Sequence, residues 1–274
     1  MDGPIVELEV QDGVAWLRLN RPEALNALNR RMTAALEDTL DRVAAMDDAS
    51  VLVVAGRGRA FCAGTDMVEA SAVARGERPP PAEHAFHGFL DAVATFSKPL
   101  LCAVNGLALG IGATVLGLAD LVLMSSSARV RFPFTDLAVA PEAGSSYTLP
   151  RLLGHQHAVW ALMSSEWLSA DDCAAMGLVW KVTGPDALLD DTMAAARVLA
   201  SKPIASLVEC KRVITASRGK ALAAAQAREG QAFRRLLDEP ARTEALRALA
   251  ERRAPDFATV DAEHPVDVAR HASS

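Results

Sequence analysis

Residues 100–119 read LLCAVNGLALGIGATVLGLA, an apolar stretch that carries no charged residue. A stretch of this length could cross a membrane, and its GxxxG from Gly106 to Gly110 resembles the dimerisation face of a membrane helix. An Asn-Gly turn signal interrupts its middle, however, and further glycines follow closely. We therefore interpret the stretch as a buried strand at 100–104, a glycine turn and a buried helix at 111–118.

Strand and helix patterns alternate before and after this stretch. Alternating apolar residues on both sides of Asp12-Gly13 predict two strands joined by a tight hairpin. Apolar residues at helical spacing then occupy 30–46, and a strand pattern follows at 51–55. A similar cycle continues with a glycine-punctuated loop, a helix, the apolar stretch and another strand, over residues 56–67, 83–96, 100–118 and 121–125. This order predicts a mixed α/β core.

The remaining segments divide the chain into parts. Residues 71–82 are polar and proline-rich, which predicts a mobile surface loop. A capping-box pattern at 169–172 begins a helix, and a short strand follows Gly177. Helical patterns dominate from 185 to about 253, and 258–274 resembles a frayed tail. We therefore expect a core, a helical region and a flexible tail, over residues 1–200, 201–257 and 258–274.

Composition excludes several classes of function. The chain has 28 Lys and Arg against 34 Asp and Glu, a net charge of −6, so it offers no basic field for nucleic acid or an anionic membrane surface. Its four cysteines lie far apart without a CxxC pair or Cys/His cluster, which indicates neither a metal site nor a disulfide framework. No secretory or peroxisomal signal is visible. We expect a cytoplasmic protein that binds neither nucleic acid nor membrane.

One acidic residue stands in unusual surroundings. Glu142 lies in LAVAPEAGSSYTLP, residues 137–150, among apolar and small side chains. Desolvation disfavours the charged form of a carboxyl group and raises its pKa toward the range where it exchanges protons near neutrality. Glu142 is therefore a candidate catalytic base. From this segment alone, a solvated loop acid or a partner of a helix N-terminus is the favoured reading, because most isolated carboxylates are structural.

Two glycine-containing turns are candidates for binding an oxyanion. AFCAGTDM and NGLALGIG both lead into helices, where the backbone N–H groups of Thr65 and Ile111 would lack intrahelical acceptors. Taken singly, such a turn is more often just a tight connection. Other motifs are weak: GLALGIGATVLG lacks the third glycine of a dinucleotide fingerprint, and the serines at 145–146 are not in a GxSxG context.

Five spaced motifs agree with one family: NRPEALNALN, AFCAGTDM, AVNGLALGIGATVLGLADLVLMS, SADDCAAMGLVWKV and ALAERRAPDF. In this order, over residues 5–257, the sequence resembles the enoyl-CoA hydratase/isomerase (crotonase) superfamily. It is most similar to the Δ3,Δ2-enoyl-CoA isomerases, through GIGATVLGLADLV and PEAGSSYTLP. The resemblance implies a spiral of strand-strand-helix turns with a C-terminal helical region that forms a homotrimer or a dimer of trimers. It also implies an acyl-CoA thioester substrate and no separate cofactor.

The resemblance assigns roles to particular residues. Glu142 corresponds to the catalytic base, and the amides of Thr65 and Ile111 to the oxyanion hole. Other positions match residues that contact coenzyme A or the substrate in the family: Ala24, Phe61, Ala63, Asp66, Gly110, Phe233 and Arg252. For Arg252, a solvated charge on a helix face is an equal alternative.

The sequence departs from the hydratases of this superfamily. Those enzymes use two glutamates, and the corresponding positions hold Thr114 and Asp136. Threonine neither takes nor gives a proton at neutral pH, so the paired acid/base apparatus is incomplete. We therefore expect an isomerase with one base. The alternatives are a hydratase or other acyl-CoA-converting enzyme that uses Asp136 with Glu142, and a non-catalytic acyl-CoA-binding protein.

Overall fold

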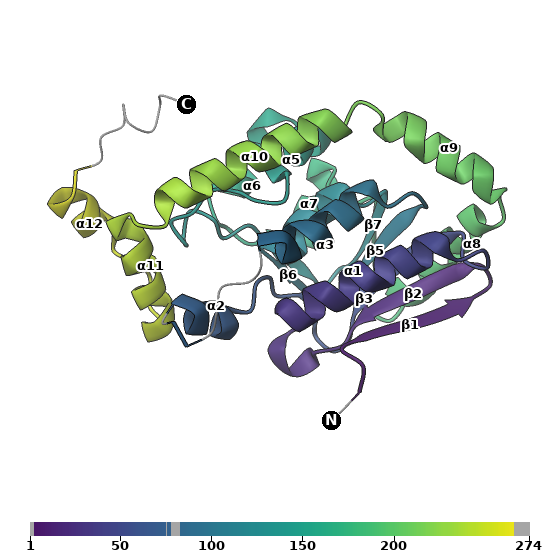
Figure 1. The fold of residues 1–274 in the computed structure, drawn as a ribbon, viewed down its shortest axis with the longest axis horizontal. Helices are drawn as coiled ribbons and strands as arrows, with labels where there is room; N and C mark the ends of the chain where they lie inside the picture. The colour runs from purple at the N-terminus through teal and green to yellow at the C-terminus, as the bar shows by residue number, and fades with distance from the viewer. Residues whose placement is uncertain (1–2, 75, 78–82, 266–274) are drawn as a thin grey trace.

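The computed structural model describes residues 3–74, 76–77 and 83–265, which form two sheets covered by helices (Figure 1). The strands of the larger sheet are β1 (Val6–Gln11), β2 (Val14–Leu19), β3 (Val51–Gly56), β5 (Leu100–Val104), β7 (Leu121–Ser125) and β10 (Lys181–Thr183). Those of the smaller sheet are β4 (Ala60–Cys62), β6 (Leu107–Leu109), β8 (Arg129–Arg131) and β9 (Leu168–Ser169). The spatial orders are β1-β2-β3-β5-β7-β10 and β4-β6-β8-β9.

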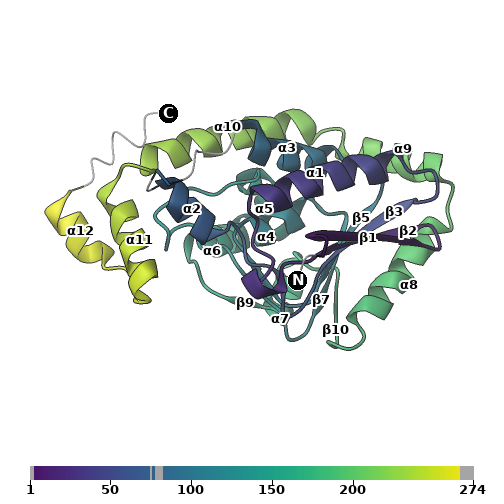
Figure 2. The same cartoon turned by 60° about the horizontal axis from the view of Figure 1, so that its bottom comes forward.

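The helices lie around these sheets. They are α1 (Arg30–Ala45), α2 (Met67–Ala74), α3 (Glu83–Thr95), α4 (Ile111–Thr114), α5 (Ser145–Leu153), α6 (His155–Met163), α7 (Ala170–Met176), α8 (Leu188–Ala200), α9 (Ile204–Thr215), α10 (Gly219–Leu236), α11 (Pro240–Glu251) and α12 (Phe257–Glu263). Two short 3-10 helices are η1 (Pro22–Ala24) and η2 (Val115–Leu118). Helices α1 and α3 cover one face of the larger sheet and α8 covers the other (Figure 2).

The larger sheet has a hydrophobic core on each face because its central strands are apolar at every position. In β3, Val51 and Val53 pack into the core beneath α8, whereas Leu52 packs into the core beneath α1 and α3. Strand side chains alternate between faces, so a continuous apolar run is what two buried faces require. The neighbouring strands from β2 to β10 pair in parallel. Strands β1 and β2 form an antiparallel hairpin, which was predicted from Asp12-Gly13.

The sequence of α1 explains where this helix begins and what it covers. The Asn29 side chain accepts a hydrogen bond from the Met32 backbone N–H at 2.9 Å, which caps the helix N-terminus. Met32, Leu36 and Leu40 then follow at four-residue spacing and are buried against the larger sheet. This stripe positions the turn before α1 beside the site described below.

The apolar stretch at 100–119 folds as the interpretation above predicts, with one addition. It forms β5, the short strand β6, α4 and η2, and all of β5 is buried. A Cβ atom on Gly106 would lie 2.1 Å from the Arg59 carbonyl oxygen, and one on Gly112 would lie 2.3 Å from that of Cys62. Glycine is needed at both positions because the backbone of β4 passes so closely. Within the described ranges, no helix is long and apolar enough to span a bilayer.

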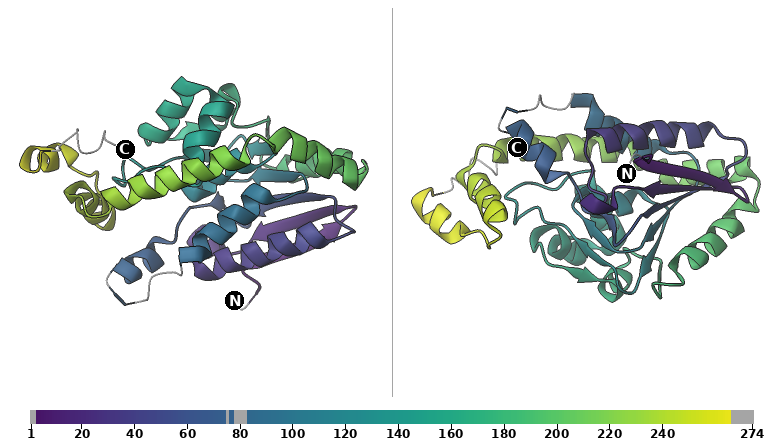
Figure 3. Two further views of the ribbon diagram at one scale, coloured as in Figure 1. Left: turned by 45° about the horizontal axis from the view of Figure 1, so that its top comes forward. Right: turned by 90° about the horizontal axis from the view of Figure 1, so that it is seen from below.

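Consecutive strands enter different sheets, which produces the predicted spiral. The pairs β3–β4, β5–β6 and β7–β8 each place one strand in the larger sheet and the next in the smaller one, before helices return the chain. The C-terminal region is helical: α10 packs on α5, and α11 and α12 lie at the end of the molecule opposite α8 (Figure 3). The α/β strand-strand-helix fold is confirmed.

Three local expectations require correction or fall outside the description. Residues 60–62 are a strand, because Ala60 and Cys62 pair with β6, although we expected a loop. Residues 71–74 continue α2, while 78–82 lie outside the described residues. Of the expected tail, 258–263 belongs to α12, whose first turn is capped by the Asp256 side chain. Residues 266–274 lie outside the described part of the chain.

Candidate active site

A cavity of about 210 Å³ brings together residues from the smaller sheet, from the turns next to it, and from helices α2, α10 and α11. Its walls are mostly apolar or glycine. The lining residues are Ala63, Gly64, Thr65, Met67, Ala70, Leu109, Gly110, Ile111, Pro133, Phe134, Leu137, Val139, Glu142, Phe233 and Arg242. In this lining, Glu142 and Arg242 are the two residues with charged side chains. The lining therefore contains a single carboxyl group.

Glu142 lies in the turn that connects the smaller sheet to α5. The backbone passes through left-handed conformations at Ala143 and Gly144, with φ of 61° and 71°. The Glu142 carbonyl then accepts hydrogen bonds from the backbone N–H and the hydroxyl of Ser145, at 3.0 and 2.6 Å. These bonds fix the Glu142 backbone at the N-terminus of α5, while its side chain lines the cavity.

The surroundings of Glu142 make it a poor acid. Burial disfavours its charged form and, with the nearby negative charge of Glu229 as a second cause, raises the pKa of Glu142 to about 7. A carboxyl group with this proton affinity is partly ionised at neutral pH. It can therefore accept a proton and return it within one reaction.

Glu229 is a functional candidate that our sequence analysis missed. It is buried on α10, and its two carboxylate oxygens accept hydrogen bonds from the backbone N–H groups of Gly144 and Ser146, at 2.7 and 2.8 Å. The acid thus satisfies free N–H groups at the start of α5 and holds the turn that carries Glu142. A sequence signal does exist: Leu222, Ala225 and Glu229 share one helical stripe, which places an acid on the buried face of α10.

The Thr65 backbone N–H is free to point into the cavity because of how the preceding segment pairs. Leu28 donates to the Gly64 carbonyl at 2.7 Å and accepts from the Asp66 N–H at 2.9 Å. In such a bridge, the N–H of the intervening residue faces the opposite side. Among the hydrogen bonds of the described residues, the Thr65 N–H donates none.

The Ile111 N–H is free for a different reason. Ile111 is the first residue of α4, so its N–H has no intrahelical acceptor, and no other acceptor occurs among the described residues. Gly110 precedes it with φ of 54°, a conformation that favours glycine. A Cβ atom on Gly64 would lie 2.8 Å from the Leu109 carbonyl oxygen, so the two turns that carry Thr65 and Ile111 touch. Two free N–H donors therefore border the cavity that Glu142 lines.

Comparison with known proteins identifies the family. The family model described as enoyl-CoA hydratase/isomerase matches residues 9–260. The chain belongs to the enoyl-CoA hydratase/isomerase family.

Relatives and solved structures agree with this assignment. The 1,2-epoxyphenylacetyl-CoA isomerase of Escherichia coli is 34% identical over 216 residues, which cover 78% of this chain and 82% of that protein. The 2,3-dehydroadipyl-CoA hydratase of the same species is 33% identical, with coverage of 90% and 96%. An enoyl-CoA hydratase/isomerase from Pseudoalteromonas atlantica has a similar structure, with a TM-score of 0.86, 33% identity and coverage of 93% and 100%. The chain is thus an enzyme of a family that acts on acyl-CoA thioesters.

Six of the residues predicted from the sequence line the same cavity of this enoyl-CoA hydratase/isomerase family enzyme. They are Ala63, Thr65, Gly110, Ile111, Glu142 and Phe233. They come from the turn after β4, from the turn before α4, from the turn before α5 and from α10, which are far apart in the sequence. The spiral of the fold brings these segments together.

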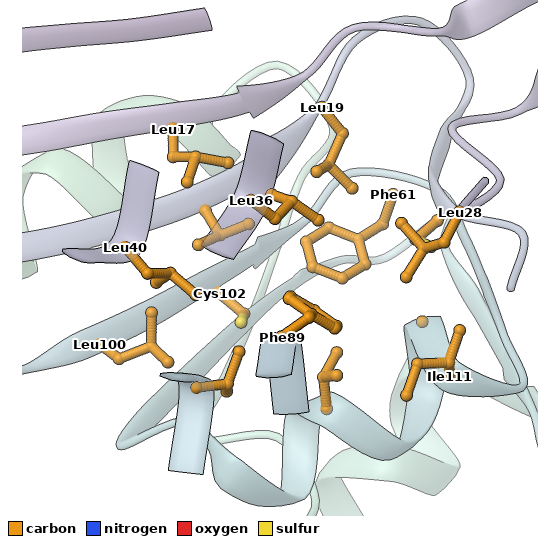
Figure 4. Close-up of a pocket in the computed structure, with 15 residues that line it drawn as sticks. Leu17, Leu19, Leu28, Leu36, Leu40, Phe61, Phe89, Leu100, Cys102 and Ile111 are labelled. Atoms are coloured by element: carbon orange, nitrogen blue, oxygen red, sulfur yellow. The ribbon is translucent and has the colours of Figure 1, made fainter. Parts of the chain in front are cut away.

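Phe61 and Asp66, two predicted coenzyme A contacts, interact with other residues of this chain. Phe61 lies in an apolar cluster behind the Ile111 turn, among Leu19, Leu28 and Leu36 (Figure 4). The Asp66 side chain accepts from the N–H groups of Val68 and Glu69 at 3.0 and 3.2 Å, and from Arg21 at 3.0 Å. Burial opposes ionisation of Asp66, but these hydrogen bonds outweigh it and lower its pKa. Neither residue is in the lining of the Glu142 cavity.

Two further predicted contacts lie elsewhere on the chain. Ala24 ends η1 and is not in the cavity lining, but the carbonyl of the next residue, Leu25, accepts from the Ala63 N–H at 3.0 Å. Arg252 follows α11 with φ of 56°, is exposed, and is not in the lining of the Glu142 cavity. The contact of Arg252 with coenzyme A, which the resemblance places across a subunit boundary, stays a prediction.

The two positions that correspond to hydratase glutamates are not part of the cavity lining. The Asp136 carboxylate forms an ion pair with Arg131, and its backbone N–H donates to the Ser165 hydroxyl at 3.2 Å. The Thr114 hydroxyl donates to the Ile111 carbonyl at 3.3 Å. The lining of the cavity therefore contains no second acid that could act with Glu142. Among the described residues, no group of three His, Cys, Asp or Glu side chains is placed to hold a metal ion.

Proposed function

We propose that the enzyme is a Δ3,Δ2-enoyl-CoA isomerase, which moves a double bond of an acyl-CoA from C3 to C2. The observation that carries this proposal is the lone carboxyl group of Glu142 in a cavity bordered by two free backbone N–H donors. Isomerisation needs one group that removes a proton and returns it. It also needs donors for the negative charge that develops on the thioester oxygen.

In this mechanism the thioester carbonyl accepts hydrogen bonds from the backbone N–H groups of Thr65 and Ile111. The Glu142 carboxylate removes a proton from C2, and the electrons of that C–H bond delocalise into a dienolate whose oxygen carries negative charge. The protonated Glu142 then gives the same proton to C4, so the double bond ends between C2 and C3. No water, oxidant or second base enters the balance.

The proton affinity of Glu142 suits this exchange. With a pKa of about 7, the group is available as a base at neutral pH and becomes a usable acid after the first transfer. Each N–H donor aimed at the oxyanion typically contributes a factor of about 100 to 1,000 in rate. The apolar walls limit access of water, which would otherwise quench the dienolate.

Hydration is supported less well by the cavity, although relatives in the family are named as hydratases. Adding water across a double bond requires one group to position the water and another to deliver a proton. Asp136 is engaged by Arg131 outside the cavity, and Thr114 is no acid. A human relative named enoyl-CoA delta isomerase 2 supports a shift of the double bond. We also propose that the enzyme forms a homotrimer or a dimer of trimers and that it is located in the cytoplasm.

The test supplies substrates of both reactions to the purified enzyme. Cis- and trans-3-enoyl-CoA thioesters of several lengths should yield conjugated 2-enoyl-CoA, followed by ultraviolet absorbance and mass spectrometry. With a 2-enoyl-CoA substrate, no 3-hydroxyacyl-CoA should accumulate. Faster formation of hydroxyacyl-CoA than of isomerised product would overturn the proposal in favour of a hydratase, and inactivity with every thioester would favour the binding-protein alternative.

A further inference from the structure

Arg242 is the charged residue of the cavity lining that the proposed reaction does not use. It lies in the first turn of α11, is half-buried, and donates from Nη1 to the Leu137 carbonyl at 2.7 Å. It also lines the apolar groove between α2 and α11, together with Met67, Val68, Ala70, Ser71, Leu246, Leu249 and Ala250. The guanidinium group therefore stands at the junction between the catalytic cavity and this groove.

No acidic side chain of the described residues balances this charge. None of them lies within 4.0 Å of the Arg242 side chain. Glu142 is the single acid in the linings of the cavity and the groove. Its pKa is raised, whereas an ion pair with Arg242 would lower it. Glu244, the next acid along α11, is bound by Arg247 and Arg253. Burial without a counter-charge accordingly lowers the pKa of Arg242.

The hydrogen bond to Leu137 leaves most donors of the Arg242 side chain without a partner among the described residues. A guanidinium group has five N–H donors in a planar fork, and the Leu137 carbonyl uses one of its nitrogens. Partial burial of an unpaired cation beside apolar walls is unfavourable unless an anion arrives. The fork matches the two oxygens of a carboxylate especially well.

We propose that Arg242 binds a carboxylate at the far end of the acyl group, so that the enzyme acts on acyl-CoA thioesters of dicarboxylic acids. This assignment rests on the proposed function, because it takes the Thr65 and Ile111 amides as the thioester end of the cavity. Those amides and Arg242 border one small chamber, so a short acyl chain could meet both. The phosphates of coenzyme A are instead separated from the thioester by the whole pantetheine arm, which makes them the weaker candidate.

The experiment measures binding of unreactive pairs that differ in one terminal carboxylate. Dissociation constants of hexanoyl-CoA and adipoyl-CoA, of octanoyl-CoA and suberoyl-CoA, and of free coenzyme A are determined by calorimetry. We expect the wild-type enzyme to bind the carboxylated member of at least one pair about tenfold more tightly. In Arg242→Met, which keeps an unbranched side chain for packing, this preference should disappear while the ratio between uncharged acyl chains persists.

Two further variants keep the result interpretable. Arg242→Lys retains the charge without the fork and should show an intermediate preference. Arg228→Met removes an exposed arginine of α10 outside both linings and should keep the full preference. Equal binding of both members in the wild-type enzyme at both lengths overturns the inference. A loss of affinity in Arg242→Met that is equal for all ligands, free coenzyme A included, also overturns it and assigns Arg242 to the phosphates.

The same ligand pairs separate this inference from the proposed function. If the carboxylate preference is found but 3-enoyl-CoA substrates are not isomerised, the binding role stands and the isomerase assignment fails. If isomerisation occurs without any carboxylate preference, the isomerase assignment stands and the proposed role of Arg242 fails.

Discussion

Glu142 illustrates how a local environment converts a common side chain into a base that works at neutral pH. Its backbone is fixed by Ser145, its carboxyl group is enclosed by apolar walls, and Glu229 adds a negative charge nearby. Desolvation and like charge both favour the protonated form. The carboxyl groups of Glu142 and Glu229 are not hydrogen-bonded to each other, because both oxygens of Glu229 accept from backbone N–H groups.

Replacing Glu142 by Gln should abolish proton transfer and leave the fold intact. General acid/base catalysis by one side chain contributes a factor of about 100 to 10,000, so we expect kcat for 3-enoyl-CoA isomerisation to fall by that amount. Binding of a saturated acyl-CoA should persist. A Glu142→Gln variant with more than half of the wild-type kcat would remove this residue from the mechanism.

The pKa of Glu142 predicts the pH dependence of activity. Since the base must be ionised, kcat/KM should decrease as the pH falls below about 7. Stability carries the opposite sign: a pKa raised above the ordinary 4.5 stabilises the native state at low pH, and this contribution is lost as the pH rises through about 7. The Tm of Glu142→Gln relative to wild type should therefore be higher at pH 8 than at pH 4. A Tm difference independent of pH would contradict the raised pKa.

Removing the charge of Glu229 should move the activity profile. Gln at this position keeps one acceptor for the Gly144 or Ser146 N–H but carries no charge, so the pKa of Glu142 should fall and the acid limb of kcat/KM should shift to lower pH. If Glu229 had only a structural role, Glu229→Gln should have a lower Tm, but the acid limb of its kcat/KM profile should stay at the wild-type pH. The exposed Glu166 supplies a control, since Glu166→Gln removes the same charge from a residue that makes none of these contacts.

The predictability of these residues depends on how local their signals are. Glu142, Thr65 and Ile111 could be predicted because each lies in a short segment whose composition limits the surroundings. Glu229 could not be assigned to Glu142, since its bond to Gly144 joins residues 85 positions apart. The Arg131 ion pair that engages Asp136 is likewise visible only in three dimensions.

At the scale of elements, close backbone contacts position the oxyanion-hole turns. Helix α4 packs on β4 through Gly112, whose hydrogen lies where a side chain would collide with the Cys62 carbonyl. Glycine-punctuated patterns predicted turns at these places, and the buried strand and helix around them were predicted correctly. Strand β4 was missed because three residues next to glycines carry too short a pattern to distinguish a strand from a loop.

Substituting Gly112 by Ala tests this contact. The added Cβ would lie 2.3 Å from a backbone oxygen that cannot move freely, so the free energy of unfolding should fall by about 1 to 3 kcal/mol. Gly219→Ala is the matched control, because nothing lies within 4 Å of its Cβ position at the start of α10. Chemical denaturation should show that variant within about 1 kcal/mol of wild type. Equal stability of the two variants would contradict the packing argument.

At the scale of the whole molecule, the surface of α6 is unusual for a monomer. Trp160 and Met163 lie one turn apart on this helix and are 55% and 64% exposed. Large apolar side chains on one helix face are typical of contacts between subunits. In agreement with the resemblance to trimeric enzymes, we expect light scattering to give the mass of three or six chains. A monomer across the micromolar range would contradict this expectation.

The central claim is that Glu142 carries one proton from C2 to C4 in a mostly apolar cavity. The most direct measurement uses a 3-enoyl-CoA with deuterium in place of both hydrogens at C2 and follows the label in the 2-enoyl product of the first turnovers by mass spectrometry and NMR. One deuterium stays at C2, and the other is the one that Glu142 removes. The account predicts that a substantial fraction of the deuterium appears at C4, and that Glu142→Gln forms no such product. A product that keeps deuterium at C2 but carries none at C4, formed equally well by Glu142→Gln, would contradict it.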